Sequence, residues 1–113
     1  MKRTFIQADF FKYEIDSRPD GKILLQVIES EILKNPEAGD LVQGTGGVRK
    51  MRVPDSTRGK GKRGGLRVLF LDLPDREHTH LLVLYGKDQA DDLSTEGKKM
   101  IRRMVIEIKG SDT

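Results

Sequence analysis

The sequence Leu66-Arg67-Val68-Leu69-Phe70-Leu71 precedes the turn residues Leu73-Pro74-Asp75-Arg76, and Leu81-Leu82-Val83-Leu84-Tyr85 follows them. Both apolar runs have the length and composition of strands, and proline at the second position of the intervening segment favours a type I turn. The two runs are therefore predicted to pair as an antiparallel hairpin. Because both faces of its centre are apolar, we expect helices to cover one side of this hairpin and part of the other.

Two amphipathic segments upstream of the hairpin are predicted to be helices. Asp9 begins the first, which ends at Arg18-Pro19 because proline cannot continue a helix. The second begins near Asp20 and ends at Asn35-Pro36. Its main apolar residues recur at four-residue spacing and are Leu24, Ile28 and Ile32. We expect this stripe to lie on the sheet.

Two further strands flank these helices in the sequence. Residues 3–6 are predicted to form a short edge strand, and residues 39–47 a loop. In residues 48–53, alternation places Lys50 and Arg52 on one face of a strand.

A last helix begins at Asp92 or Ser94. Its apolar residues follow helical spacing and are Ile101, Met104, Val105 and Ile108. The predicted order is β-α-α-β-β-β-α, which is an α+β fold with a small sheet rich in antiparallel pairs.

Length and composition limit the classes of protein. The chain of 113 residues fits one compact domain, residues 1–113. It has no cysteine, which excludes a disulfide framework, a thiolate metal site and a cysteine nucleophile. The N-terminus lacks the pattern of a signal peptide, and no segment approaches the roughly 20 apolar residues that span a bilayer. We therefore expect a soluble cytoplasmic protein.

The positive charge of the chain is concentrated between Gln43 and Arg67. Eight basic residues and one acid, Asp55, give this stretch a net charge of +7, whereas the whole chain carries +3 and the remainder therefore sums to −4. Glycines interrupt the run repeatedly. A local basic segment of this kind predicts a polyanionic partner, most simply a nucleic acid.

Three motifs occur in order around the predicted hairpin. They are Gln43-Gly44-Thr45-Gly46-Gly47-Val48-Arg49-Lys50, then Gly59-Lys60-Gly61-Lys62-Arg63-Gly64-Gly65-Leu66-Arg67, then Leu84-Tyr85-Gly86-Lys87. With the element order, they make most of the chain resemble the HigB-like branch of the RelE/ParE toxin superfamily. The resemblance implies the toxin of a type II toxin–antitoxin pair, a ribosome-dependent mRNA endonuclease that a HigA-like helix-turn-helix antitoxin holds inactive.

The resemblance also implies a chemistry that needs neither metal nor cofactor. The RNA 2′-hydroxyl attacks the adjacent phosphate, so the protein must accept a proton, donate a proton and stabilise negative charge. Lys50 and Lys62 are the candidate bases, because crowding by arginines lowers the pKa of a lysine. Arg67 is expected to brace the scissile phosphate with its planar fork. Tyr85 is expected either to stack a base or to donate a proton.

The remaining cations are expected to hold flanking phosphates, where they supply affinity without reading sequence. They are Arg49, Arg52, Arg58, Lys60, Arg63 and Lys87. The chain departs from the RelE pattern at the start of the last helix, where Ser94 stands in place of a tyrosine. This departure is the reason for assigning the acid or stacking role to Tyr85.

Other interpretations of these features stay open. The basic segment is also consistent with a non-catalytic RNA- or DNA-binding module, and the fold with a protein–protein adaptor. Gly44-Thr45-Gly46-Gly47 leads into a strand instead of a helix, so a turn is predicted there and not a phosphate-binding loop. His78 and His80 have metal-chelating spacing but no evident third ligand, and we predict that they lie at an exposed hairpin tip.

Overall fold

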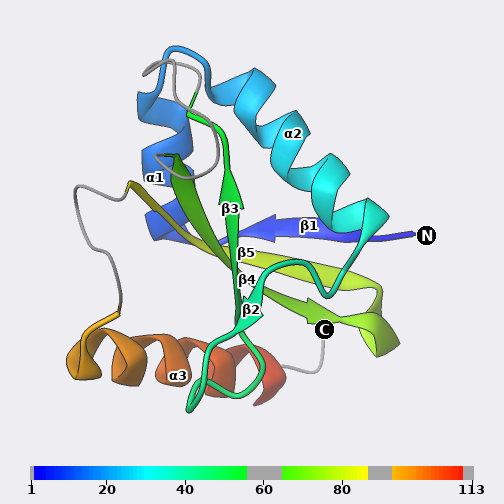
Figure 1. Cartoon of the computed structure of the whole chain (residues 1–113). Helices are drawn as coiled ribbons and strands as arrows, with labels where there is room; N and C mark the ends of the chain where they lie inside the picture. Colours follow the sequence, from blue (N-terminus) through cyan, green and yellow to red (C-terminus); the bar gives the residue numbers. More distant parts are fainter. Residues whose placement is uncertain (1, 56–64, 87–92, 111–113) are drawn as a thin grey trace.

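The computed structural model describes residues 2–55, 65–86 and 93–110, and these residues form a mixed sheet between two layers of helices (Figure 1). In chain order the elements are β1 (Thr4–Gln7), α1 (Asp9–Ser17), α2 (Gly21–Lys34), β2 (Asp40–Leu41), β3 (Arg49–Val53), β4 (Leu66–Leu73), a 3₁₀ turn (Pro74–Arg76), β5 (His78–Gly86) and α3 (Thr95–Gly110). The predicted α+β class and element order are confirmed. One correction is β2, which lies within the segment predicted to be a loop.

The strands are ordered β1-β5-β4-β3-β2 across the sheet. The predicted hairpin of β4 and β5 is confirmed, and β4 also pairs antiparallel with β3. β1 pairs in parallel with β5, on the side of β5 away from β4. The predicted type I turn is a short 3₁₀ turn, after which Glu77 adopts a left-handed conformation with φ of 55°.

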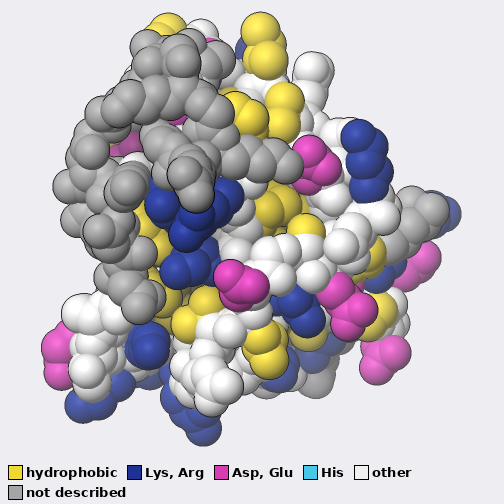
Figure 2. Space-filling model, viewed as in Figure 1, with side chains coloured by type: hydrophobic (Ala, Val, Ile, Leu, Met, Phe, Trp, Pro, Cys, Tyr) yellow, Lys and Arg dark blue, Asp and Glu magenta, His cyan; other side chains and the backbone are white. Residues whose placement is uncertain are grey.

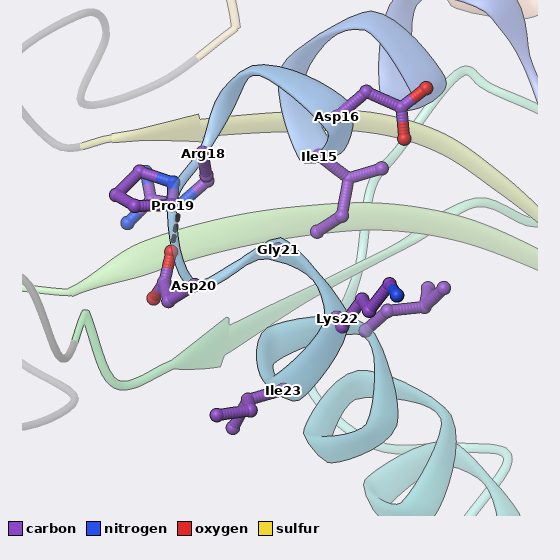
Figure 3. Close-up of a pocket in the computed structure, with 9 residues that line it drawn as sticks. Ile15, Asp16, Arg18, Pro19, Asp20, Gly21, Lys22 and Ile23 are labelled. Carbon is purple, nitrogen blue, oxygen red and sulfur yellow. Dashed lines mark hydrogen bonds and ion pairs between the residues drawn. The ribbon is translucent and has the colours of Figure 1, made fainter.

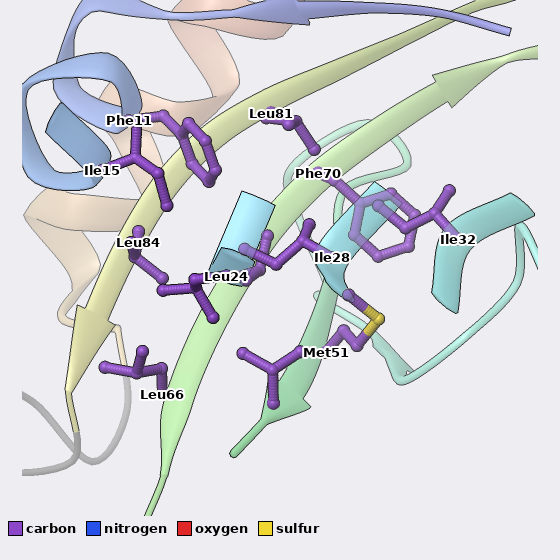
Figure 4. Packing of buried hydrophobic residues seen from close by; sticks show 12 residues of the cluster. Phe11, Ile15, Leu24, Ile28, Ile32, Met51, Leu66, Phe70, Leu81 and Leu84 are labelled. Atoms are coloured by element: carbon purple, nitrogen blue, oxygen red, sulfur yellow. The ribbon is translucent and has the colours of Figure 1, made fainter. Parts of the chain in front are cut away.

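α1 and α2 cover one face of the sheet. Their buried side chains pack against β3, β4 and β5 in a cluster that includes Phe11, Ile28, Met51, Phe70 and Leu84 (Figure 4). The four-residue stripe predicted for α2 is buried, which confirms that it faces the sheet.

α3 covers the opposite face. Ile101 and Val105 are buried against Leu69 and Leu71 of β4, and the rest of the predicted stripe is partly buried. The backbone N–H of Gly97 donates to Oγ of Ser94 at 3.0 Å, so Ser94 is the N-cap of this helix. Every residue from 66 to 71 is buried, so β4 needs the helices on both of its faces.

The glycine-rich segment before β3 is a turn, as predicted. The Thr45 hydroxyl donates to the carbonyl of Val42 at 2.7 Å and accepts the N–H of Val48 at 3.2 Å. Gly46 has φ of 84°, and its carbonyl accepts a hydrogen bond from Nζ of Lys109 in α3 at 2.7 Å. These contacts hold the start of β3 against the helix.

The prediction for the two histidines is wrong. His78 and His80 lie at the start of β5, opposite Thr4 and Ile6 of β1, and both are half-buried. Burial lowers the pKa of His80, and the nearby His78 and Arg76 lower it further. The hairpin tip is the preceding 3₁₀ turn.

No helix in the described part of the chain is long and apolar enough to cross a membrane.

An ion pair joins Arg3, the residue before β1, to Asp72 of β4 at the end of the sheet near this turn. Nε of Arg3 lies 2.7 Å from Oδ1 of Asp72, which also accepts a hydrogen bond from the Thr79 hydroxyl at 2.8 Å. Burial alone would raise the pKa of Asp72, but the hydrogen bonds from Arg3 and Thr79 outweigh it and hold that pKa below its usual value. The charged carboxylate therefore stabilises the fold.

We predict that Asp72→Asn lowers the free energy of unfolding by about 1–3 kcal/mol at pH 7, because Arg3 loses its charged acceptor. A folded pKa below the unfolded value of about 3.9 means that this contribution is present above that pH and is lost as pH falls through the folded pKa. Urea unfolding of both proteins between pH 3 and pH 7 checks this. The difference between them should shrink in acid, and a difference that is independent of pH would contradict the prediction.

Candidate functional site

Three site residues lie in one row across the sheet. Arg52 of β3 is directly opposite Arg67 of β4, and Arg67 is directly opposite Tyr85 of β5. Directly opposed residues of antiparallel strands project from the same face, with Cβ atoms about 4.5–5.5 Å apart. The predicted meeting of Arg67 and Tyr85 is confirmed. We call Arg52, Arg67 and Tyr85 the Arg67 row.

The Arg67 row lies on the face of the sheet that α3 covers. Leu69, two residues after Arg67, packs in the α3 cluster, and so does Tyr85. Figure 2 shows Lys and Arg side chains gathered in the middle of this view, above α3. Arg52 is exposed, so the row runs from solvent into the protein.

Arg67 is a buried cation, with a relative exposure of 3%. Its Nη1 donates to the carbonyl of Gly65 at 2.8 Å. Its Nε is buried and has no hydrogen-bond partner among the described residues. A buried donor without a partner is costly, and an anionic oxygen at Nε would remove that cost. Within the described part of the chain, Arg67 therefore has an unpaired donor whose chemistry matches a phosphate or another oxyanion.

Tyr85 is also buried, with a relative exposure of 7%. Its ring packs with Leu69 and Ile101 in the α3 cluster. Little of the ring is therefore available to stack on a base. Of the two roles expected for Tyr85, this leaves proton donation by its hydroxyl.

Lys50 lies on the same face of β3 as Arg52, one alternation further along the strand. The predicted shared face of these two cations is confirmed, since the residues between and after them, Met51 and Val53, are buried on the other side. Lys50 is directly opposite Asp40 of β2, an acid that the sequence did not associate with it.

Arg49 is placed away from the Arg67 row. It alternates with Lys50 and projects from the opposite face, where Nη1 donates to the carbonyl of Glu37 at 2.9 Å and to that of Gly39 at 3.3 Å. Its described contacts therefore hold the segment before β2. The other predicted site residues lie outside the described residues and are Lys62, Arg58, Lys60, Arg63 and Lys87.

Two residues near the site were not identified from sequence. Arg18 follows α1, and its Nη2 lies 2.7 Å from Oδ1 of the buried Asp55. One feature of the sequence pointed to Asp55, which is the only acidic residue of the basic stretch from Gln43 to Arg67. Within residues 2–55, 65–86 and 93–110, no group of three or more His, Asp or Glu side chains is placed to hold a metal ion.

No protein-family model matches the chain. Among solved structures, it is similar to the toxin RelE of E. coli in the free state, in a mutant with two arginines replaced by alanine. The TM-score is 0.59 over 80% of this chain and 90% of that chain, at 12% sequence identity. The chain has a RelE-like fold. This agrees with the fold expected from the three sequence motifs.

The exposed end of the Arg67 row yields a prediction about binding. We expect Arg52→Ala to reduce the slope of log affinity against log salt for single-stranded RNA by about 0.7, the loss of one phosphate contact. Filter binding over a range of salt concentrations measures the slope. Lys34→Ala, which removes an exposed cation from the far layer of helices, is the control and should leave it unchanged. Equal slopes for Arg52→Ala and the unmodified protein would exclude Arg52 from the contact.

Proposed function

We propose that this protein is the toxin of a type II toxin–antitoxin pair and a ribosome-dependent mRNA endonuclease of the HigB-like kind. The observation that carries the proposal is the Arg67 row, in which a buried arginine lies between an exposed arginine and a tyrosine. The RelE-like fold supports it, because the similar structure is that of a toxin.

The row suits cleavage by the RNA 2′-hydroxyl. Arg67 would contact the scissile phosphate and stabilise the additional negative charge of the transition state. Its position on a strand buried on both faces limits its movement, which favours a preorganised contact. Arg52, at the exposed end, would hold a flanking phosphate.

Proton transfer is assigned to lysine and tyrosine side chains. Lys50 lies on the face of the Arg67 row and is a candidate base, and Lys62 is the second candidate from the sequence. The packed ring of Tyr85 favours proton donation over base stacking. Arg58, Lys60, Arg63 and Lys87 would add phosphate contacts.

The partners follow from this function. We expect a HigA-like helix-turn-helix antitoxin that inhibits the protein, and the ribosome with its bound mRNA as the substrate complex. The proposed site of action is the cytoplasm. The ribosome would orient the mRNA, so activity on free RNA is expected to be slight.

We predict that Arg67→Ala lowers the rate of mRNA cleavage on purified ribosomes a few hundredfold, because a lost transition-state contact of this kind costs about 3 kcal/mol. Mapping of cut ends over time measures the rate. Arg67→Lys keeps the charge without the planar fork and should be intermediate. Lys22→Ala removes an exposed cation from the opposite layer and is the control.

The same assay separates a nuclease from a non-catalytic binding module. A binding module would bind RNA with the same dependence on salt but produce no cut ends. An unmodified protein that never cuts ribosome-bound mRNA, or an Arg67→Ala protein that cuts at the original rate, would refute the proposed function.

A separate prediction concerns the tyrosine hydroxyl. Tyr85→Phe keeps the ring that packs under α3, so we expect an unchanged melting temperature to within a few degrees. Cleavage should slow about 100-fold if the hydroxyl is the proton donor, with RNA binding preserved. Single-turnover cleavage measures this. An active Tyr85→Phe protein would assign the donor role to another group.

A further inference from the structure

A part-buried ion pair joins the turn between α1 and α2 to Asp55, two residues after the end of β3. Nη2 of Arg18 lies 2.7 Å from Oδ1 of Asp55, and its Nε lies 3.1 Å from Oδ1 of Asp20. The side chains of Arg18 and Asp55 are 16% and 6% exposed. Figure 3 shows Arg18 and Asp20 together in this turn. One guanidinium thus holds two carboxylates from different parts of the fold.

The turn that carries Arg18 has little freedom to move. A Cβ atom at Gly21 would lie 2.2 Å from the carbonyl oxygen of Ile15, so α1 and α2 approach each other closely here. The N–H of Gly21 donates to the carbonyl of Arg18 at 3.2 Å, and Pro19 between them has a fixed φ. The backbone of Arg18 is therefore restricted in position where its side chain contacts Asp55.

Asp55 is also packed against the residue that contacts Arg67. A Cβ atom at Gly65 would lie 2.2 Å from the carbonyl oxygen of Val53 and 3.3 Å from the backbone nitrogen of Asp55. The carbonyl of Gly65 accepts the hydrogen bond from Nη1 of Arg67. A displacement of Asp55 would therefore reach the Arg67 guanidinium through one intervening residue.

We propose that Arg18 and Asp55 are positioning residues for Arg67. Their ion pair holds Asp55 against Gly65, and the Gly65 carbonyl in turn holds the guanidinium that braces the scissile phosphate. This inference rests on the proposed function. Misplacement of a catalytic group by about 1 Å is enough to slow a reaction about 100-fold. The exposed cations that bind flanking phosphates do not depend on this pair, so substrate affinity should change little.

The fold contains a matched ion pair that serves as a control. Arg3 and Asp72 also make a 2.7 Å contact, and their side chains are 9% and 13% exposed. Asp72 lies five residues after Arg67 on β4, about 17 Å along the strand. Asp72→Asn should therefore destabilise the fold comparably to Asp55→Asn without displacing Arg67.

The experiment compares kcat and KM for ribosome-bound mRNA in the unmodified protein, Asp55→Asn and Asp72→Asn, well below each melting temperature. We expect Asp55→Asn to lower kcat at least about tenfold with KM changed less than about threefold, and Asp72→Asn to leave both within about twofold. Arg18→Lys keeps the positive charge but cannot bridge two carboxylates as a planar fork does, so it should lower kcat less than Asp55→Asn does. It also replaces Asp55→Asn if that variant does not fold. Equal kcat values for the two Asp→Asn variants would overturn the inference and leave the proposed function standing.

A second measurement does not depend on cleavage. The NMR signal of the Nε–Hε group of Arg67 reports its environment directly, and it should shift in Asp55→Asn but not in Asp72→Asn. If the unmodified protein never cuts mRNA, the proposed function fails, and this signal still tests positioning. An Arg67 signal that is unchanged in Asp55→Asn would refute the positioning role by itself.

Discussion

The register of β3, β4 and β5 is the constraint on which the site depends. Every residue from 66 to 71 of β4 is buried, with Val68 and Phe70 in the α1–α2 cluster and Leu69 and Leu71 in the α3 cluster. A slip of one residue would exchange these two sets and move Arg67 to the other face of the sheet. The packing of both cores therefore places Arg67 between Arg52 and Tyr85.

An irregularity in β5 allows side chains at its two ends to face opposite sides of the sheet. Leu69 pairs with Val83 but Phe70 pairs with Leu81, so Leu82 is an extra residue in the ladder. A bulge of this kind reverses the alternation of the strand beyond it. Tyr85 can therefore face α3 while Thr79, six residues earlier, faces the other side and hydrogen-bonds Asp72.

The elements with local signals were predictable. The apolar runs of β4 and β5, and the helices bounded by Arg18-Pro19 and Asn35-Pro36, follow from periodicity and from the geometry of proline. The parallel pairing of β1 with β5 and the two-residue β2 carry no such signal, because each depends on a partner distant in sequence. The burial of His78 and His80 was missed for the same reason, since β1 lies beside them.

In the candidate site, too, the arrangements with local sequence signals were predictable and those that depend on distant residues were not. The proximity of Arg67 and Tyr85 follows from the hairpin, and the shared face of Lys50 and Arg52 follows from strand alternation. The position of Arg52 directly opposite Arg67 needs the register of β3, which the intervening segment does not reveal. The contact of Arg18 with Asp55 joins residues 37 apart in sequence and becomes visible only in the folded chain.

Three arginines show why Arg67 stands apart among the described residues. Arg3 and Arg18 each lie against an aspartate, so their charges are neutralised within the fold. Arg67 is buried more deeply than either, yet its hydrogen bond in this part of the chain goes to an uncharged carbonyl and its Nε has no partner there. A buried cation without a counter-ion is unfavourable, whereas an ion pair within the protein would compete with an incoming phosphate. Of these three arginines, Arg67 is the one that the described part of the chain leaves without an aspartate, which is the arrangement that the proposed phosphate contact requires.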